Sequence, residues 1–387
     1  MNMCIKQGDT KEVAFREVNA KSLLRKHKKV ESWFLTRYGM NLYRGCAHNC
    51  VYCDGRSEKY QVDGEFGREV TVKINAIDLL RRELDPHRRR TPLKPGFIGL
   101  GGGVGDSYQP IEKKYKLSRR ALQLVYDFDF PVHILTKSTL VERDLDLIKK
   151  IHEKKRAIVS FSFSSTNDDI SRIFEPGVPS PTERLETIRL FKREGIFCGM
   201  FLMPVIPFIT DKTGIIDETI KNARDAGVDF VVFGGMTLKE GRQKNYFYKT
   251  LDKHYPVLIA EYHHIYKKYP YGNAIDSYYE SIHKTFNIVA NKYHLPKRIP
   301  PKVYGDMLDE NDKVVVILEQ IDYLLKLQGR KSPYGFAAYS ISQVQQPLST
   351  MKDKLRQIKG VGPATEKIIL DILNTGTSSY YEKLLTG

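Results

Sequence analysis

Residues 41–56 read NLYRGCAHNCVYCDGR, and three cysteines in this stretch, Cys46, Cys50 and Cys53, decide how the chain is interpreted. Cysteine thiolates are the usual ligands of iron–sulfur clusters, and a [4Fe–4S] cube normally takes four of them. Three thiolates on one loop therefore leave one iron without a protein ligand. The spacing predicts a [4Fe–4S] cluster held by these cysteines, with an open iron that can bind a small molecule.

Two other metal sites use the same residues. His48 lies between the first two cysteines, and a Cys3His zinc site would combine the sulfur and nitrogen ligands that zinc accepts. Structural zinc sites usually pair two short ligand clips across a longer loop, and the next cysteine along the chain is Cys198. The second alternative is an electron-transfer cluster whose fourth ligand is Cys4 or Cys198.

The composition of the 387 residues is that of a globular protein, with 41% hydrophobic and 28% charged residues. No apolar run approaches the length of a membrane span, and the first 30 residues lack the hydrophobic stretch of a signal peptide. The five cysteines, three of them clustered, do not indicate a disulfide framework. We expect a cytoplasmic protein with no membrane partner.

The charge is strongly basic, with 62 Lys and Arg against 46 Asp and Glu and a formal net charge of +16. Such a balance attracts polyanions, so it favours nucleic acid as a partner. Any single basic run is typical of a solvated surface. The total positive charge supports a nucleic-acid partner only in combination with a second motif near the C-terminus.

From about residue 96, short apolar runs alternate with amphipathic stretches. The apolar runs, rich in β-branched and aromatic residues, predict buried parallel strands, and the stretches between them predict crossover helices. The strands are expected at 96–101, 131–136, 157–163, 196–203 and 228–233, and the helices at 118–128, 141–154, 182–195 and 215–227.

A further strand near 36–44 and a helix over 75–84 bring the total to about six β/α units. This series, without a dinucleotide fingerprint, predicts an α/β fold built as a barrel or part of one. Such folds place their chemistry at the carboxyl ends of the strands, and the cysteine loop follows the first strand.

The domain organisation follows from changes in composition. We expect a basic N-terminal arm at 1–35, the barrel at 36–245, a tyrosine-rich helical extension at 246–335, and a linker or loop at 332–347. Tyr262, Tyr266 and Tyr269 fall on one helical face, which is typical of packing and, less often, of a platform on which bases stack.

The segment LRQIKGVGPATEKIILDIL (355–373) fits a helix-hairpin-helix motif within residues 350–375. Leu355 and Ile358 would lie on the first helix, and Ala364, Ile368 and Ile369 would pack the second.

In such a hairpin, Gly360 and Gly362 permit a turn whose N–H groups face outward at the start of a helix, which suits a phosphate. Lys359 and Lys367 add positive charge. These four residues are the candidate nucleic-acid contacts, and they would position a duplex without reading its sequence. The alternative is a helical hairpin that only packs or binds protein.

The cysteine spacing, with aromatic Tyr52 directly before Cys53, matches the CxxxCxΦC pattern of radical S-adenosylmethionine (SAM) enzymes, and the chain resembles that superfamily. The resemblance implies two cofactors, a [4Fe–4S] cluster and SAM, whose methionine amino and carboxylate groups chelate the open iron. It also implies a low-potential electron donor such as ferredoxin or flavodoxin. An electron from the cluster then splits the sulfonium and releases a 5′-deoxyadenosyl radical.

Within that superfamily, residues 40–235 resemble the spore photoproduct lyase branch through a series of motifs in order: SYQPIE, ILTKS, RDLDLIKK, SFS, EPGVPSPTERLETIRLFKREGI and PVIPFITD. The resemblance implies a partial (β/α)6 barrel. It also implies that Lys137 and Ser162 contact the methionine carboxylate or ribose of the cofactor and that Tyr52 packs near its adenine. Otherwise Lys137 is an ordinary rim lysine and Ser162 a core hydroxyl.

Three consecutive glycines, Gly101, Gly102 and Gly103, end the strand in FIGLGGGVGDSYQPIE (97–112). Residues without side chains let backbone amides approach a ligand, which suits the amino end of the bound methionine group. The segment fails the G-x-G-x-x-G pattern because Val104 takes the last glycine position. A tight turn without a ligand is the alternative.

One departure from the lyase branch concerns the hydrogen-atom donor, a cysteine downstream of the cluster in characterised lyases. Residues 54–197 of this chain contain no cysteine, and Cys198 is expected early in its strand, in the core. Tyr108 is the candidate donor and the one catalytic residue that we predict.

These observations predict a radical SAM enzyme that acts on DNA in a photoproduct lyase-like repair or modification. The target base would have to be flipped or already distorted, since a base inside a duplex is out of reach. Two alternatives are a radical SAM enzyme that modifies RNA or protein, and a non-catalytic nucleic-acid-binding protein with a structural cluster.

Overall fold

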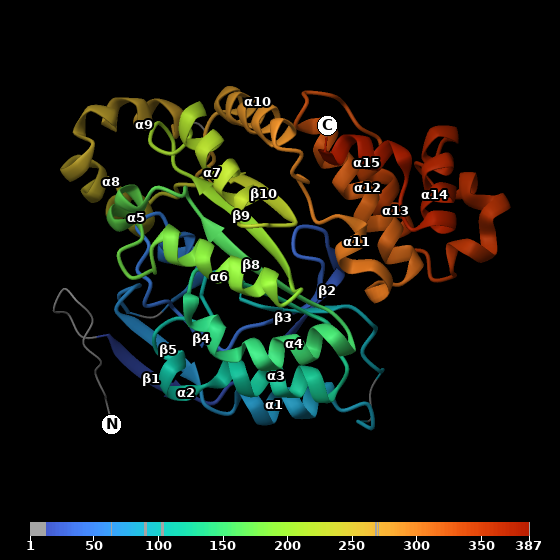
Figure 1. Cartoon of the computed structure of the whole chain (residues 1–387), viewed down its shortest axis with the longest axis horizontal. Helices are drawn as coiled ribbons and strands as arrows, with labels where there is room; N and C mark the ends of the chain where they lie inside the picture. Colours follow the sequence, from blue (N-terminus) through green and yellow to red (C-terminus); the bar gives the residue numbers. More distant parts are fainter. Residues whose placement is uncertain are drawn as a thin grey trace.

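A computed structural model describes residues 13–62, 64–88, 91–101, 104–267, 269 and 271–386. Its centre is a seven-stranded sheet with strand order β10-β9-β8-β7-β6-β3-β2 (Figure 1). Neighbouring strands from β3 to β10 pair in parallel, and β2 pairs antiparallel with β3. The strands are β2 (Leu24–Glu31), β3 (Thr36–Met40), β6 (Phe97–Leu100), β7 (Val132–Thr136), β8 (Ala157–Phe163), β9 (Phe197–Val205) and β10 (Phe230–Gly235). The six parallel strands confirm the α/β class and the partial barrel.

A smaller sheet pairs β5 (Glu69–Lys73) in parallel with β1 (Ala14–Val18) and antiparallel with β4 (Tyr43–Arg44). The segment 1–35, expected as a basic arm, therefore contains two strands, β1 and β2. These strands were not predicted because they are rich in basic residues and lack an apolar pattern. Lysines and arginines are typical of edge strands, where charge discourages pairing with other chains.

Amphipathic helices cover the outer face of the large sheet (Figure 1), and each lies within a few residues of its expected position. They are α1 (Ala76–Leu84), α3 (Leu117–Asp127), α4 (Leu145–Lys154), α6 (Pro181–Arg193) and α7 (Thr213–Asp225). Helix α6 shows why the boundaries are sharp: Ser180 and Glu183 form a capping box, and Pro181 occupies the first turn. The apolar faces of these helices form the largest core together with the outer face of the sheet.

The helices directly after the last strand are α8 (Arg242–His254), α9 (Ile259–Ile265) and α10 (Asp276–Lys292). Tyr262 and Tyr266 are buried, and their hydroxyls donate to the carbonyls of Pro207 (2.7 Å) and Met236 (2.9 Å). These two tyrosines pack the core, so a base-stacking role for them is wrong.

The C-terminal helices form a separate cluster with a core of its own (Figure 1). They are α12 (Glu310–Lys326), α13 (Tyr334–Ile341), α14 (Pro363–Thr375) and α15 (Ser379–Thr386), with a 3-10 segment, η6 (Leu348–Gln357), before α14. Helix α13 corrects the expected linker at 332–347, because Ala337, Ala338 and Ile341 are fully buried.

The hairpin before α14 also differs from the expected motif. Its first limb, η6, is a 3-10 segment with a kink at Met351, and Ile358 follows it in extended conformation. Leu355, Ile368 and Ile369 are buried as expected, whereas Ala364 is exposed.

The inner face of the sheet is covered toward the amino ends of its strands. Phe97, Ile158, Phe201 and Phe230 pack there against Val316 of α12. The carboxyl ends of the strands are left for a site. Among the described residues, no helix is long and apolar enough to cross a bilayer.

Candidate active site

The three clustered cysteines face one cavity of about 480 Å³ at the carboxyl ends of the parallel strands. Cys46 and Cys50 are 7% and 6% exposed, Cys53 is half-buried, and all three are free thiols. The opposite walls come from the strand ends: Leu135, Thr136 and Lys137 from β7, Ser162 from β8, Met203 and Pro204 from β9, and Gly235, Met236 and Thr237 from β10.

A buried arginine holds the cysteine loop in shape. The guanidinium of Arg56 donates to the carbonyls of Cys50 (3.1 Å), Asn49 (3.2 Å) and Phe66 (3.2 Å). Its plane also lies 3.5 Å from the ring centroid of Tyr246. These contacts hold the loop in its observed conformation.

A second set of contacts fastens the loop to the end of β10. The Asp54 carboxylate accepts from Thr237 Oγ1 (2.7 Å) and Lys239 Nζ (2.6 Å), and Gln243 Nε2 donates to the carbonyl of Tyr52 (2.9 Å). These contacts join the first and last parallel strands across the mouth of the partial barrel.

His48 does not behave as a metal ligand. Its Nδ1 pairs with the carbonyl of Gly177 (2.9 Å), and its Nε2 pairs with Asp106 (3.2 Å). No group of three or more His, Cys, Asp or Glu side chains in the described part of the chain could hold a single metal ion. Both facts count against a Cys3His zinc site, whereas the thiolates of a cluster bind different irons and need not converge on one point.

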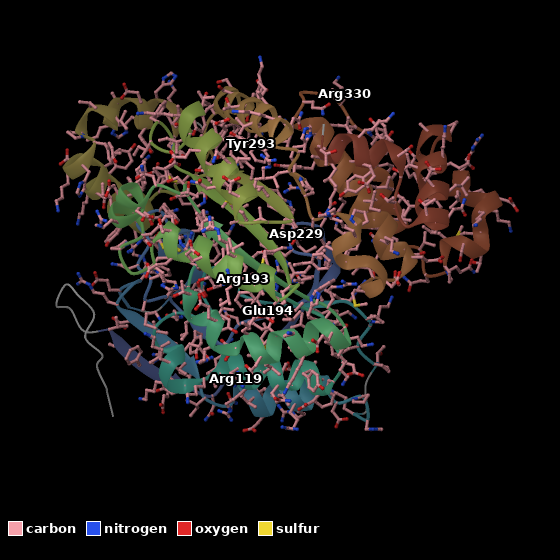
Figure 2. The ribbon with its side chains drawn as sticks, in the orientation of Figure 1. Arg119, Arg193, Glu194, Asp229, Tyr293 and Arg330 are labelled. Atoms are coloured by element: carbon pink, nitrogen blue, oxygen red, sulfur yellow. The ribbon has the colours of Figure 1, made fainter. Side chains whose placement is uncertain are left out.

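Cys198 lies at the opposite end of the sheet from the cavity. It is fully buried at the start of β9, and its backbone N–H donates to Asp229 (2.8 Å). Figure 2 shows Asp229 well away from α5 (Asp168–Phe174) and α8, which flank the cysteine loop. Cys198 is therefore a core residue. Cys4, the other alternative ligand, lies outside the described residues.

The donor set fits a [4Fe–4S] cluster with one open iron. Burial, reinforced by the charge of Asp106, raises the pKa of the Cys46 thiol, and burial likewise raises the pKa of Cys50. Three thiolates so close together need the positive charge of bound iron to be stable. Cys46, Cys50 and Cys53 would hold the cluster.

The buried carboxylate of Glu175, directly after α5, organises the wall opposite the cysteines. It accepts from Lys137 Nζ (3.0 Å), Arg184 (2.6 Å), Ser171 Oγ (3.0 Å) and the Tyr52 hydroxyl. Burial alone would raise the pKa of Glu175, but the charges of Arg184 and Lys137 lower it below its ordinary value. Glu175 is therefore ionised and holds Lys137 and Tyr52 in place.

The structure brings together Tyr52, Lys137 and Ser162, three of the predicted cofactor residues. All three line the cavity, and Lys137 Nζ donates to Ser162 Oγ (2.9 Å). The Ser162 hydroxyl in turn donates to the carbonyl of Met203 (2.8 Å). Ser162 is therefore a support for Lys137 with no donor left for a ligand.

The glycine run has a structural role at the one position that is described. Gly101 has φ +84°, and a Cβ there would lie 2.2 Å from the carbonyl oxygen of Leu135. It lets the chain turn tightly against β7 and does not line the cavity, whereas Gly105 and Asp106 do. Gly102 and Gly103 lie outside the described residues.

Tyr108 is placed where it cannot act as the predicted hydrogen-atom donor. It is fully buried in the outer core, and its hydroxyl donates to Asp144 (3.1 Å) rather than facing the cavity.

The candidate nucleic-acid residues lie far from the cavity. In Figure 1, α14 is at one end of the molecule, and α5 and α8, beside the cysteine loop, are at the other. Gly360 has φ +88°, Gly362 precedes the first turn of α14, and Lys359 and Lys367 are exposed.

Sequence reasoning missed the residues that support the site: Glu175, Arg184, Asp106 and Arg56. Asp106 accepts from Thr136 Oγ1 (2.8 Å) and from the backbone N–H of Lys137 (2.7 Å), so it fixes the end of β7. The only available signal was their position within or beside the family motifs, since nothing local marks a buried ion pair.

The chain is similar in sequence to known proteins. The sequence model of the Radical SAM superfamily matches residues 40–215. An uncharacterized protein of Mycobacterium tuberculosis is 31% identical over 287 residues, which cover 73% of this chain and 82% of that protein. An uncharacterized protein of Methanocaldococcus jannaschii is 31% identical over 249 residues, covering 64% and 86%.

A solved structure of spore photoproduct lyase, complexed with dinucleoside spore photoproduct, has the same fold with a TM-score of 0.53. The two proteins are 16% identical, and the match covers 72% of this chain and 79% of the lyase. At this identity the likeness concerns the fold alone.

Proposed function

Because the chain belongs to the radical SAM superfamily, we propose that it cleaves SAM at a [4Fe–4S] cluster and uses the 5′-deoxyadenosyl radical on a nucleic acid, most simply on a DNA base or lesion. The observation that carries the proposal is the set of three cysteines facing one cavity that Lys137 also enters. When bound, the cluster and SAM together supply the electron and the radical.

Lys137 is the residue best placed to bind the cofactor carboxylate. An ammonium group has three N–H donors, and two of them go to Ser162 and Glu175. The third is left for the cavity, which Lys137 lines. Ser162 and Glu175 fix the direction of that donor, so binding needs little reorganisation.

The other walls of the cavity are mainly apolar. Phe34, Leu135, Met203 and Met236 line the cavity with apolar surface, and Tyr52 adds an aromatic ring. A dry pocket protects a reactive intermediate from side reactions and strengthens the ionic contacts of Lys137. Tyr52 would pack near the adenine.

Two features support a nucleic acid as the substrate: the formal net charge of +16 and the hairpin at Gly360. The hairpin precedes α14, which lies at the other end of the molecule from α5 and α8 beside the cysteine loop (Figure 1), so the hairpin would anchor the nucleic acid at a distance. A base that reaches the cavity would have to be flipped out or already unpaired.

The test is anaerobic reconstitution of the cluster followed by assay of 5′-deoxyadenosine with dithionite as reductant. Undamaged DNA, ultraviolet-irradiated DNA, RNA and a mixture of unfolded polypeptides are compared in parallel. The proposal expects DNA, above all irradiated DNA, to stimulate the reaction. Stimulation by RNA or polypeptide alone would overturn the DNA substrate. No 5′-deoxyadenosine under any condition would overturn the enzyme.

A further inference from the structure

A second hollow, a groove of about 960 Å³, lies on the other side of the cysteine loop. Alternate residues of the loop face opposite ways. Cys46, His48, Cys50 and Tyr52 line the cavity, whereas Ala47, Asn49 and Val51 line the groove. The loop is therefore a shared wall between the two hollows, with the thiols on one side and small or polar side chains on the other.

The backbone of the loop is hydrogen-bonded to the backbone of residues 174–177. The N–H of Val51 donates to the carbonyl of Phe174 (2.8 Å), and the N–H of Gly177 donates to the carbonyl of His48 (3.1 Å). A Cβ at Gly177 would lie 2.7 Å from that carbonyl oxygen, so no side chain fits between the two segments. The loop and the paired segment 174–177 thus form the wall between the groove and the residues that hold the cluster.

The charge of the groove has one sign. Among the residues that the structure describes, its lining includes Arg68, Lys249, Lys253 and His254 and no Asp or Glu. Arg68 is paired with Glu65 (2.9 Å). Lys249 and Lys253, one turn apart on α8, are exposed, and the described part of the chain offers them no ion pair or hydrogen bond. These two lysines present uncompensated positive charge beside the wall.

We propose that this groove is the docking site of an acidic, low-potential redox protein that delivers electrons to the cluster. The inference rests on the function proposed above. One electron leaves the reduced donor, which is oxidised, and crosses the loop to the iron–sulfur group, which is reduced, and no atom is transferred. A negatively charged donor is attracted by Lys249 and Lys253, and its redox centre can approach the cluster while the cavity stays free for SAM and substrate.

The test uses reconstituted protein and flavodoxin, an acidic flavoprotein, as the probe. The variant is Lys249→Glu/Lys253→Glu. The control is Lys26→Glu/Lys28→Glu, which makes the same charge change at two exposed lysines of β2, at the far edge of the large sheet. Binding is measured by anaerobic calorimetry at low and high salt, and electron transfer by the rate at which reduced flavodoxin is reoxidised on mixing.

We expect the groove variant to bind flavodoxin at least about tenfold more weakly and to lose the salt dependence of the native protein. We expect the control to behave as the native protein does. SAM cleavage with dithionite, which needs no docking site, should be the same in all three proteins. Its absence in all three would refute the proposed function instead.

Three results would overturn the docking site. The first two are equal loss of flavodoxin binding in both variants and no loss in either. The third is a groove variant that keeps its affinity for flavodoxin but loses its affinity for DNA, which would assign the groove to the phosphate backbone.

Discussion

Glu175 shows how one buried residue supports the whole wall opposite the cysteines. Its carboxylate and the Arg184 guanidinium are both fully buried, and the same carboxylate orients Lys137. A buried charge is tolerated only when it is paired and hydrogen-bonded, so each member depends on the others.

We expect Glu175→Gln to lower the free energy of unfolding by about 3–5 kcal/mol, because Arg184 then stays buried without its counter-ion. Chemical denaturation at neutral pH measures the effect. The matched control is Glu186→Gln, which breaks the exposed pair with Arg189 and should cost at most about 1 kcal/mol. Similar losses in the two variants would contradict this view of Glu175.

Lys137 is expected to act in ligand binding more than in stability, because its side chain is 14% exposed and faces the cavity. Lys137→Met should weaken SAM binding at least about tenfold, since a hydrogen bond to a charged group is lost. Equilibrium dialysis of reconstituted protein measures this. Lys192→Met, which removes the partner of Asp229 at the other end of the sheet, should leave SAM affinity unchanged. Equal SAM affinity in both variants would show that Lys137 does not bind SAM.

Among the elements, β7 connects the site to the core beneath it. Thr136 and Lys137 lie at its carboxyl end. His133, lower on the same strand, is buried between the carbonyl of Phe34 (2.7 Å) and Ser160 Oγ of β8 (2.8 Å). The inner face of the sheet therefore contains a polar contact that links β7, β8 and the connection between β2 and β3.

His133 should make stability fall as the pH falls. Burial lowers its pKa to about 4 from the ordinary 6.5, so below pH 6.5 the unfolded chain binds a proton that the folded chain does not. The free energy of unfolding should drop by up to about 3 kcal/mol between pH 6.5 and pH 4 on account of this residue.

His283, whose pKa is also lowered to about 4 by burial and by Arg298, should contribute a similar drop. The fall in the free energy of unfolding with pH should therefore be smaller in His133→Gln than in the native protein, measured by denaturation at several pH values. If the free energy of unfolding changed with pH in this variant as it does in the native protein, His133 would have to be protonated in the folded protein.

Elements with a strong local period could be predicted from the sequence. Helix α6 and strands β7 to β10 lie where apolar periodicity and capping signals placed them, and the cysteine spacing located the site loop. Strands β1 and β2 were missed because they are charged and half-exposed, so their hydrogen-bonded partners, and not their own pattern, make them strands. Helix α13 was not predicted because Pro333 and Gly335 are residue types typical of loops. The segment is helical because its apolar face is buried against α12.

The site was predictable only in part. The cysteines, Tyr52 and Lys137 stood out through motifs. Glu175 and Arg184 become partners only when α5 and α6 pack against the strand ends, which a single sequence does not reveal. The prediction of Tyr108 as hydrogen-atom donor was wrong for the same reason. Tyr108 lies close to the site in sequence, but its side chain packs into the core between the sheet and the outer helices.

Across the whole molecule, α14 lies at the opposite end from α5 and α8, which flank the cysteine loop (Figure 1). If the hairpin anchors nucleic acid, Lys359→Glu/Lys367→Glu should weaken DNA binding at least about tenfold and reduce its salt dependence. SAM cleavage without substrate should stay the same. Binding is measured by fluorescence anisotropy over a salt series, and Lys26→Glu/Lys28→Glu again serves as the charge control. Loss of DNA affinity in the control alone would show that DNA binds at β2 and not at the hairpin.

In the proposed enzyme, Cys46, Cys50 and Cys53 hold a four-iron cluster that leaves one iron open to SAM. Electron paramagnetic resonance of the anaerobically reconstituted and reduced protein, recorded before and after SAM is added, detects both the cluster and its open iron. We expect a reduced [4Fe–4S] signal that changes shape when SAM binds, and the loss of this signal in Cys50→Ala but not in Cys198→Ala. A protein that contains only zinc, or a cluster signal that SAM leaves unchanged, would contradict this proposal.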